Sequence, residues 1–428
     1  MRVRSELVTT AVIGGGPAGL AICLAACRLD KLEALLNDGF VIFERSSSFG
    51  PGTLGRFRIK SDSLAASFLR FMEPVTPVGL EGLATHEETR SLRDRMGDSI
   101  PLLEAASFLG IVGAEMESLA ARSSAEGLVK LNTAVKSAHM LAGGGWKLAL
   151  ENGEDGLKFD QIVLATGGRP DLARQISGLV AGRPLSPELA NSLFQAQELL
   201  TLAGQQALCH RLRRLSNPRV VVVGGSHTAL SCLQILLEMR PDWADGSIAL
   251  VHRSPLRVTY ATPDEAIADC CEFQLNDVCA ATGRVFPLAG FRSSSRDLAR
   301  RLLNRPGTMP EARVRLISIA DHSHADIWSE LSAADIVIPA LGYVPVGLPL
   351  FDKQGDSINW RSSGMVDGKC RVIDAHGNPI LGLFGIGLAA GHPMASQWGE
   401  PSFTGQANGL ALWQTEIGET LVRELVPV

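Results

Sequence analysis

The sequence predicts an α/β fold built from two Rossmann-type units, each suited to bind a dinucleotide. Two segments carry this prediction, residues 8–44 and residues 219–253. In each of them a short apolar run leads into a glycine-containing turn, then a helical segment and a second apolar run. Such runs are typical of strands buried in a parallel sheet, and the turn between strand and helix is the usual pyrophosphate site. A chain of 428 residues is long enough for two domains.

Composition and charge narrow the class of protein. Apolar residues make up 46% of the chain and charged residues 20%, which favours large packed cores over disorder. The net charge of −5, without any basic block, disfavours nucleic acid or an anionic membrane as a partner. The eight cysteines form no C-x-x-C pair, so we expect reduced thiols in a cytoplasmic protein and no metal site. The uncharged stretch 7–27 allows a secretion signal as an alternative, but Gly14–Pro17 would break such a helix.

The first glycine-rich turn has the pattern G-x-G-x-x-G. Gly14 permits a tight turn, Gly16 lets the backbone approach a pyrophosphate, and Gly19 lets the next helix pack closely on the strand. A helix over residues 17–29 then directs its first N–H groups at the phosphates. The second strand ends in Glu44, whose carboxylate would accept both ribose hydroxyls. A glycine turn alone also suits a structural turn, but the whole series predicts a dinucleotide site.

The second turn is a degenerate version of the first. It begins at Gly224, with Ser226 in place of the second glycine and Ala229 in place of the third. Thr228, at the start of the following helix, is a further candidate for contact with phosphate. The next strand is followed by Arg253 instead of an acid. Because an arginine pairs with a 2′-phosphate that a carboxylate would repel, we predict NADPH over NADH. The alternative is that Arg253 is an ordinary solvated charge.

With further segments, the chain resembles the two-dinucleotide-binding-domain flavoprotein superfamily. The matching segments are residues 14–19, 41–45, 132–135, 160–168 and 383–387. This resemblance implies that FAD occupies the first unit and NADPH the second. The implied FAD contacts are Gly14, Gly16, Gly19, Glu44, Arg45, Val135, Thr166, Gly167, Gly387 and Gln406, and the implied NADPH contacts are Gly224, Ser226, Thr228 and Arg253. One departure is Leu388, which follows Gly387 where many members carry an aspartate.

The resemblance also implies that the NADPH-binding domain is inserted into the FAD-binding domain. We expect the FAD-binding domain to comprise residues 1–172 and 336–428, with the NADPH-binding domain at 216–335. Residues 173–215 are predicted as a helical connector, which either packs between the domains or covers a substrate entrance; we favour packing.

The segment 334–345 is similar to the D-x3-(L/F)-A-T-G-Y motif of class B flavin monooxygenases, notably amine N-hydroxylases. Asp335, Ala340, Gly342 and Tyr343 match this motif, whereas Pro339 and Leu341 depart from it. The similarity implies that NADPH reduces FAD and that O2 forms a flavin peroxide. One oxygen would then pass to a nucleophilic nitrogen or sulfur of a small molecule. One alternative is an NAD(P)H-dependent reductase or dehydrogenase passing electrons to a quinone, disulfide or carrier. Another is a flavoprotein that has lost catalysis.

The candidate catalytic residues are Lys60, His392 and Asn408. Lys60 follows the second strand of the first unit, where the superfamily places residues over the flavin ring. His392 and Asn408 precede the last helix, which in this superfamily points its N-terminus at the flavin's pyrimidine ring. Gln406 and Asn408 would donate hydrogen bonds there; the alternative is that Thr404 caps the helix and the amides pack locally. The sequence leaves the substrate and the oligomeric state open.

Overall fold

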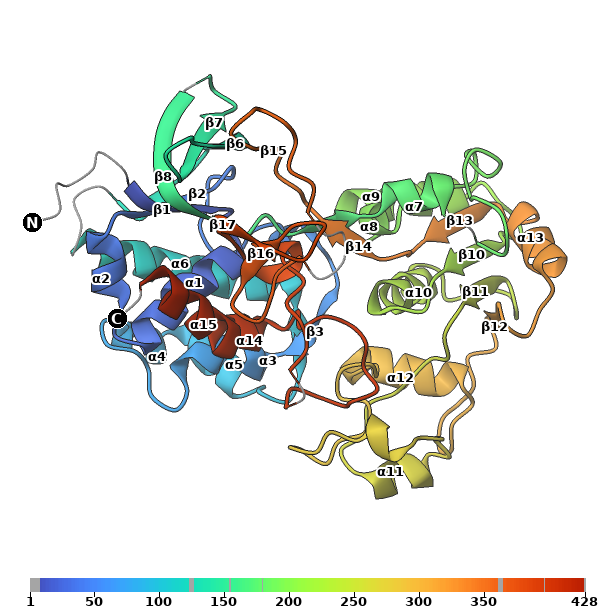
Figure 1. The fold of residues 1–428 in the computed structure, drawn as a ribbon. Coiled ribbons are helices and arrows are strands. Elements are labelled where there is room, and N and C mark those ends of the chain that lie inside the picture. Colours follow the sequence, from blue (N-terminus) through green and yellow to red (C-terminus); the bar gives the residue numbers. More distant parts are fainter. Residues whose placement is uncertain are drawn as a thin grey trace, which may run out of the picture.

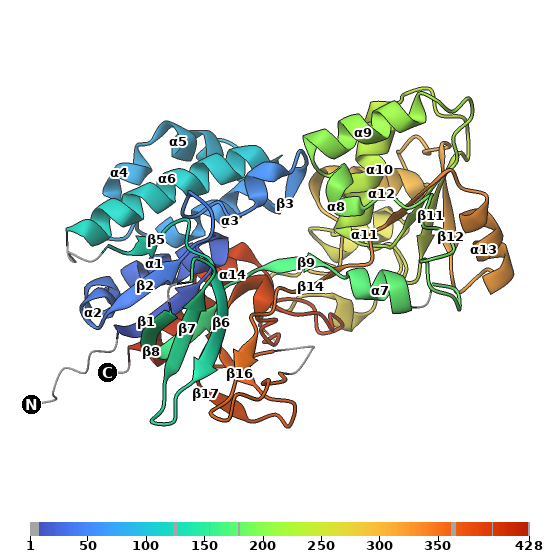
Figure 2. The same ribbon diagram turned by 90° about the horizontal axis from the view of Figure 1, so that it is seen from above.

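The computed structural model describes residues 8–122, 127–153, 155–178, 180–360, 365–395 and 397–426. The chain forms two parts, seen side by side in Figure 1 and again from above in Figure 2. Each part is built around a largely parallel sheet with helices packed on it, so the predicted α/β fold class is confirmed. Among the described residues, no helix combines the length and apolar character needed to cross a membrane.

The first part contains the larger sheet. Its strands are β1 (Val8–Ile13), β2 (Phe40–Phe43), β5 (Val129–Lys130), β6 (Val135–Met140), β7 (Trp146–Leu150), β8 (Asp155–Leu164), β15 (Leu350–Phe351), β16 (Arg371–Ile373) and β17 (Pro379–Gly385). Strand β1 pairs in parallel with β2 on one side and with β8 on the other. Strand β17 pairs in parallel with the end of β8, with Leu383 opposite Ile162. The carboxyl ends of β1, β2, β8 and β17 therefore lie at one edge of the sheet, as a dinucleotide site requires.

Helices cover this sheet and enclose the main core of the first part. They are α1 (Pro17–Arg28), α2 (Leu32–Asn37), α3 (Ala65–Leu69), α4 (Glu81–Ala84), α5 (Glu87–Arg93), α6 (Leu102–Ala121), α14 (Leu410–Gln414) and α15 (Glu416–Leu425). Helix α1 is buried over most of its length, since residues 18–27 are nearly inaccessible to solvent. A small two-stranded sheet of β3 (Lys60–Leu64) and β4 (Ser99–Pro101) lies at the side facing the second part (Figure 2).

The second part contains a four-stranded parallel sheet, counted over the described residues, in the order β12–β11–β10–β13. These strands are β10 (Val220–Val223), β11 (Ile248–His252), β12 (Val314–Ser318) and β13 (Ile336–Pro339), and the helices around them are α10 (His227–Met239), α11 (Pro263–Ala268), α12 (Ser293–Leu302) and α13 (His324–Ser332). Every residue of β10 and β13 is buried, which explains their unbroken apolar sequences. Because β13 pairs with β10, this sheet extends to Pro339, beyond the expected limit of residue 335.

The predicted connector packs on the second part. It contains α7 (Leu172–Ser177), α8 (Ala196–Leu199) and α9 (Leu202–Leu212). Leu199 and Leu208 are fully buried in the same core as α10, and Phe194 donates its N–H to the carbonyl of Val337 at 2.9 Å. The connector thus completes the edge of the smaller sheet through its contacts with the second part.

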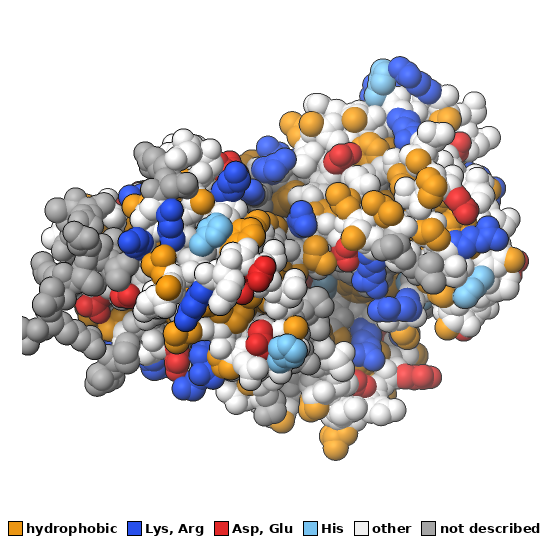
Figure 3. Space-filling view, turned by 45° about the horizontal axis from the view of Figure 1, so that its top comes forward, with side chains coloured by type: hydrophobic (Ala, Val, Ile, Leu, Met, Phe, Trp, Pro, Cys, Tyr) orange, Lys and Arg blue, Asp and Glu red, His pale blue; other side chains and the backbone are white. Residues whose placement is uncertain are grey.

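Two antiparallel strands connect the parts. Strand β9 (Gly168–Pro170) leaves the first part and β14 (Tyr343–Pro345) returns to it, with Val344 opposite Arg169. The molecular surface is hollowed between the parts on the face shown in Figure 3, where Lys and Arg side chains border the hollow. Near the carboxyl end of the described chain, helix α14 begins at Leu410, directly after its N-cap residue Gly409. The alternative that Thr404 caps the last helix is therefore wrong, because five residues separate it from the first helical position.

Candidate functional site

The first glycine turn joins β1 to α1 and has the geometry predicted for a pyrophosphate site. Gly14 has φ +110°, and a Cβ added there would lie 2.4 Å from the carbonyl oxygen of Ala165. A Cβ at Gly19 would lie 2.1 Å from the carbonyl oxygen of Gly14, so helix and strand touch at this point. Gly16 differs, since its nearest neighbour would be Gly52 Cα at 3.4 Å. Gly16 is therefore less tightly enclosed than Gly14 and Gly19, as the predicted approach of a phosphate to this residue requires.

Glu44 points back at this turn from the end of β2. It is buried, with 7% of its surface exposed. One carboxylate oxygen accepts a hydrogen bond from Gly15 N at 2.6 Å and the other from Ser46 N at 2.8 Å. Arg45 beside it is exposed. The structure thus holds the predicted acid against the glycine turn through these two backbone hydrogen bonds.

Three more predicted FAD contacts surround the same sheet edge. Gly387 has φ +78°, and a Cβ there would come within 2.5 Å of the Ala18 side chain in the first turn of α1. Gly167 has φ +77° with open space beside it, and the Thr166 hydroxyl donates to the carbonyl of Val346 at 2.5 Å. Val135 lies further away, at the start of β6. A cradle of backbone around the N-terminus of α1 fits a dinucleotide, and the residues present fit FAD.

The second turn repeats this geometry in the smaller sheet. Gly224 has φ +138°, and an added Cβ would lie 2.3 Å from the carbonyl oxygen of Ala340. Ser226 is the N-cap of α10, and its side chain makes no capping bond, which leaves the first N–H groups of the helix available. Arg253 is exposed directly after β11 and forms no ion pair with any described residue. Its guanidinium is free to meet a phosphate.

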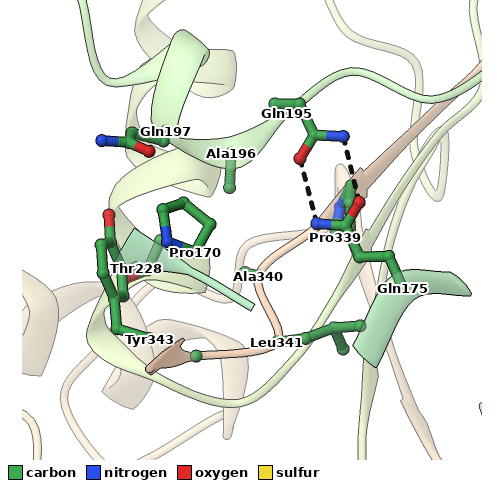
Figure 4. Close-up of a pocket in the computed structure, with 11 residues that line it drawn as sticks. Pro170, Gln175, Gln195, Ala196, Gln197, Thr228, Pro339, Ala340, Leu341 and Tyr343 are labelled. Atoms are coloured by element: carbon green, nitrogen blue, oxygen red, sulfur yellow. Dashed lines mark hydrogen bonds between the residues drawn. The ribbon is translucent and has the colours of Figure 1, made fainter. Parts of the chain in front are cut away.

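A pocket opens beside this turn, at the carboxyl end of β13 (Figure 4). Its lining includes Thr228 from α10 and residues 339–343, the segment that resembles the monooxygenase motif. On the other side, Gln175 and Gln195 exchange two amide hydrogen bonds of 3.0 Å. The pocket therefore lies where the connector, α10 and the returning chain meet.

The candidates near the last helices are partly brought together. His392 is 7% exposed, its Nδ1 lies 2.9 Å from the carbonyl oxygen of Pro393, and its Nε2 has no hydrogen-bond partner among the described residues. Burial lowers the pKa of His392, so the imidazole is held neutral. The Gln406 side chain packs against Gly391, next to His392, whereas Asn408 is exposed. Lys60 is exposed on β3 and shares no hydrogen bond with these groups in the part of the chain described.

The chain is similar in sequence and in fold to known hydroxylases. No protein-family model matches the chain. It is 28% identical over 439 residues to the CMP-5′-(3-aminopropyl)phosphonate hydroxylase of Streptomyces rubellomurinus, covering 97% of both chains. Among solved structures, it matches an ornithine N-hydroxylase of Kutzneria sp. 744 with a TM-score of 0.55, 17% identity and coverage of 98% of this chain and 99% of that one. An ornithine hydroxylase of Pseudomonas aeruginosa matches with a TM-score of 0.57 and 13% identity, covering 98% of each.

The chain has the fold of the flavin-dependent N-hydroxylating monooxygenases. The match extends over nearly the full length of both partners, so it includes both glycine turns and the strands between the two parts. The resemblance to N-hydroxylases that the sequence motifs indicated is thereby confirmed at the level of the fold.

Sequence reasoning missed two contacts of this N-hydroxylase fold that cross between the parts. Asp62 on β3 lies 2.7 Å from Nε2 of His227, at the start of α10, and 3.7 Å from the Arg292 guanidinium. Burial by itself would raise the pKa of Asp62, but the nearby His227 side chain and the charge of Arg292 hold it below its ordinary value. The second contact is made by Glu400, a buried carboxylate bound to backbone of the second part. No local pattern in the sequence identifies either partner.

Proposed function

We propose that this chain is an FAD- and NADPH-dependent monooxygenase that transfers one oxygen atom from O2 to the amino nitrogen of a small molecule. The supporting observation is similarity to a hydroxylase over 97% of both chains, with a dinucleotide-type glycine turn in each part of the structure. The relatives' names share one chemical feature, an amine on a short alkyl chain: aminopropylphosphonate in one, ornithine in the others. A primary amine is therefore the first substrate class to test.

The residues around the first turn would hold FAD, which supplies the redox chemistry when bound. The N–H groups at the start of α1 and the backbone at Gly16 would receive its pyrophosphate, and Glu44 would accept hydrogen bonds from its ribose. Gly387 and Gly167 let backbone approach the rest of the cofactor. His392, with a neutral imidazole and its Nδ1–H given to Pro393, presents a lone pair at Nε2. That buried atom would be available to accept a hydrogen bond from a group of the substrate that reaches it.

The residues of the second part would hold NADPH. Ser226 and Thr228 would contact its pyrophosphate at the N-terminus of α10, and Arg253 would pair with its 2′-phosphate. Lys60 and Asn408, both exposed, are assigned to the substrate side. Lys60 would attract an anionic group of the substrate, and Asn408 would donate or accept one hydrogen bond.

The pair of cysteines on α1 is a poor candidate for the dithiol of a disulfide reductase. Cys23 and Cys27 share one face of α1, but both are buried in the core. Burial raises the pKa of Cys27 to about 12 and that of Cys23 well above its ordinary value. A thiolate is the reactive form, so neither side chain suits dithiol exchange.

The test mixes FAD-loaded protein anaerobically with NADPH, or with NADH, and then admits O2 together with candidate amines. We expect faster flavin reduction by NADPH, and a product heavier than the amine by one oxygen atom. Aminopropylphosphonate, its CMP conjugate, ornithine and lysine form the first panel. Reduction without any oxygenated product, combined with rapid turnover of a quinone, would instead assign a reductase. Failure of both nicotinamides to reduce the flavin would overturn the proposal.

A further inference from the structure

The chain between η4 (Gly387–Ala389) and α14 spans both parts of the molecule. We call its described residues, 390–395 and 397–409, the bridging loop. The two ends of this loop lie together in the first part, where Ala407 N donates to the carbonyl of His392 at 2.9 Å. Its middle reaches the second part. The loop that carries His392 and Gln406 is therefore also a contact between the two parts.

Glu400 fixes the middle of the bridging loop. Its carboxylate accepts a bond of 2.7 Å from Ala289 N and bonds of 3.0 and 3.2 Å from Leu288 N. Glu400 is only 3% exposed, and no Lys, Arg or His of the described chain forms an ion pair with it. Its negative charge is thus compensated by backbone N–H groups alone, in charge-assisted bonds that fix direction as well as distance.

Packing on either side of Glu400 supports the same attachment. A Cβ added to Gly399 would lie 2.2 Å from Cδ1 of Leu288, so the bridging loop and the segment that contains Leu288 are in direct contact. Ser402 N donates to the carbonyl of Asn276 at 2.9 Å. The segment that the bridging loop contacts, residues 276–289, lies in the connection between β11 and α12. This connection begins with Arg253. The loop on the proposed flavin side is therefore tied to the connection that would bind NADPH.

From these contacts we infer that Glu400 is a positioning residue for hydride transfer. This inference rests on the proposed function. Glu400 touches neither reacting group; it sets the position of the second part, with its nicotinamide, relative to the bridging loop and the flavin. Hydride transfer requires the donor carbon and the acceptor nitrogen within a narrow range, and an error of about 1 Å costs roughly a hundredfold in rate.

The experiment compares Glu400→Ala and Glu400→Gln with wild type and with Glu33→Gln, a control on the exposed face of α2. Anaerobic flavin reduction is followed at saturating NADPH in FAD-loaded protein. We expect Glu400→Ala to slow reduction by about tenfold to a hundredfold while FAD content stays unchanged. Glu400→Gln keeps one carbonyl oxygen but turns an NH2 group toward a donor. Its rate of flavin reduction should therefore lie between those of wild type and Glu400→Ala. The control should reduce at the wild-type rate.

Hydrogen–deuterium exchange of the cofactor-free protein gives a readout independent of activity. Loss of the acceptor should speed exchange in peptides covering residues 286–291 and 397–409 and leave those covering α1 and α10 unchanged. The inference would be overturned if the flavin of Glu400→Ala were reduced at the wild-type rate. It would also be overturned if exchange became faster throughout the protein, because Glu400 would then have a merely structural role. If wild type itself is not reduced, the proposed function fails, and the exchange pattern alone shows whether Glu400 ties the two parts together.

Discussion

At the scale of single residues, Gly14 and Gly16 belong to one turn but meet different surroundings. A methyl group at Gly14 would strike the Ala165 carbonyl, and φ +110° disfavours any side chain. A methyl group at Gly16 meets only Gly52, at an ordinary contact distance. We therefore expect Gly14→Ala to destabilise the protein by about 2 kcal/mol or more. Gly16→Ala should fold normally and lose FAD affinity, because the methyl group takes the space beside the phosphates.

Urea unfolding of the cofactor-free variants and FAD titration followed by flavin fluorescence measure the two effects separately. Tight FAD binding by Gly16→Ala would contradict the placement of the pyrophosphate. Gly14 and Glu44 could be singled out from the sequence because their roles depend on local backbone geometry: Gly14 has a positive φ, and Glu44 accepts a hydrogen bond from Gly15 N. Asp62 and Glu400 were not predictable, because their partners are distant in the sequence and Glu400 binds backbone groups that carry no residue signal.

At the scale of elements, the packing of α15 on α1 depends on small side chains. A Cβ at Gly418 would lie 2.9 Å from Cβ of Ala25 and 2.2 Å from the carbonyl oxygen of Trp413. Gly418→Ala should therefore cost about 1–3 kcal/mol of stability, although alanine normally favours a helix. Gly82→Ala is the matched control in α4, since nothing lies within 4 Å of its added Cβ. Equal unfolding midpoints for Gly418→Ala and Gly82→Ala would contradict this prediction, because they would show that α15 can shift away from α1 without loss of stability.

The glycine-containing turns and their flanking elements were predictable because strand periodicity and turn chemistry are local. Strand β1, helix α1 and strand β10 begin within a residue of their expected positions. The limit at residue 335 was less accurate, since an apolar run such as 336–339 does not reveal which sheet it joins. Pairing with a strand that is distant in the sequence decides which sheet the run joins, and a buried strand of either sheet has the same apolar sequence pattern.

At the scale of the whole molecule, the contact of Asp62 with His227 and Arg292 makes the attachment of the two parts sensitive to pH. Since the pKa of Asp62 is lowered in the folded protein, its contribution is present above the ordinary aspartate pKa. It is lost as the pH falls through the lowered value. Asp62→Asn should therefore lower the melting temperature slightly at pH 7 and match wild type in strongly acidic buffer. The exposed Asp245→Asn serves as control, and a difference independent of pH would contradict the assignment.

The pairing of β17 with β8 has a consequence for how the protein is made. Leu383 completes the larger sheet beside Ile162 only after the whole second part has left the ribosome. The strands of the smaller sheet, by contrast, all lie between residues 220 and 339 and can assemble while the chain is still growing. The part that is synthesised first is therefore completed last. Until β17 arrives, the carboxyl end of β8, residues 162–164, is an unpaired strand edge that is open to pairing with other nascent chains.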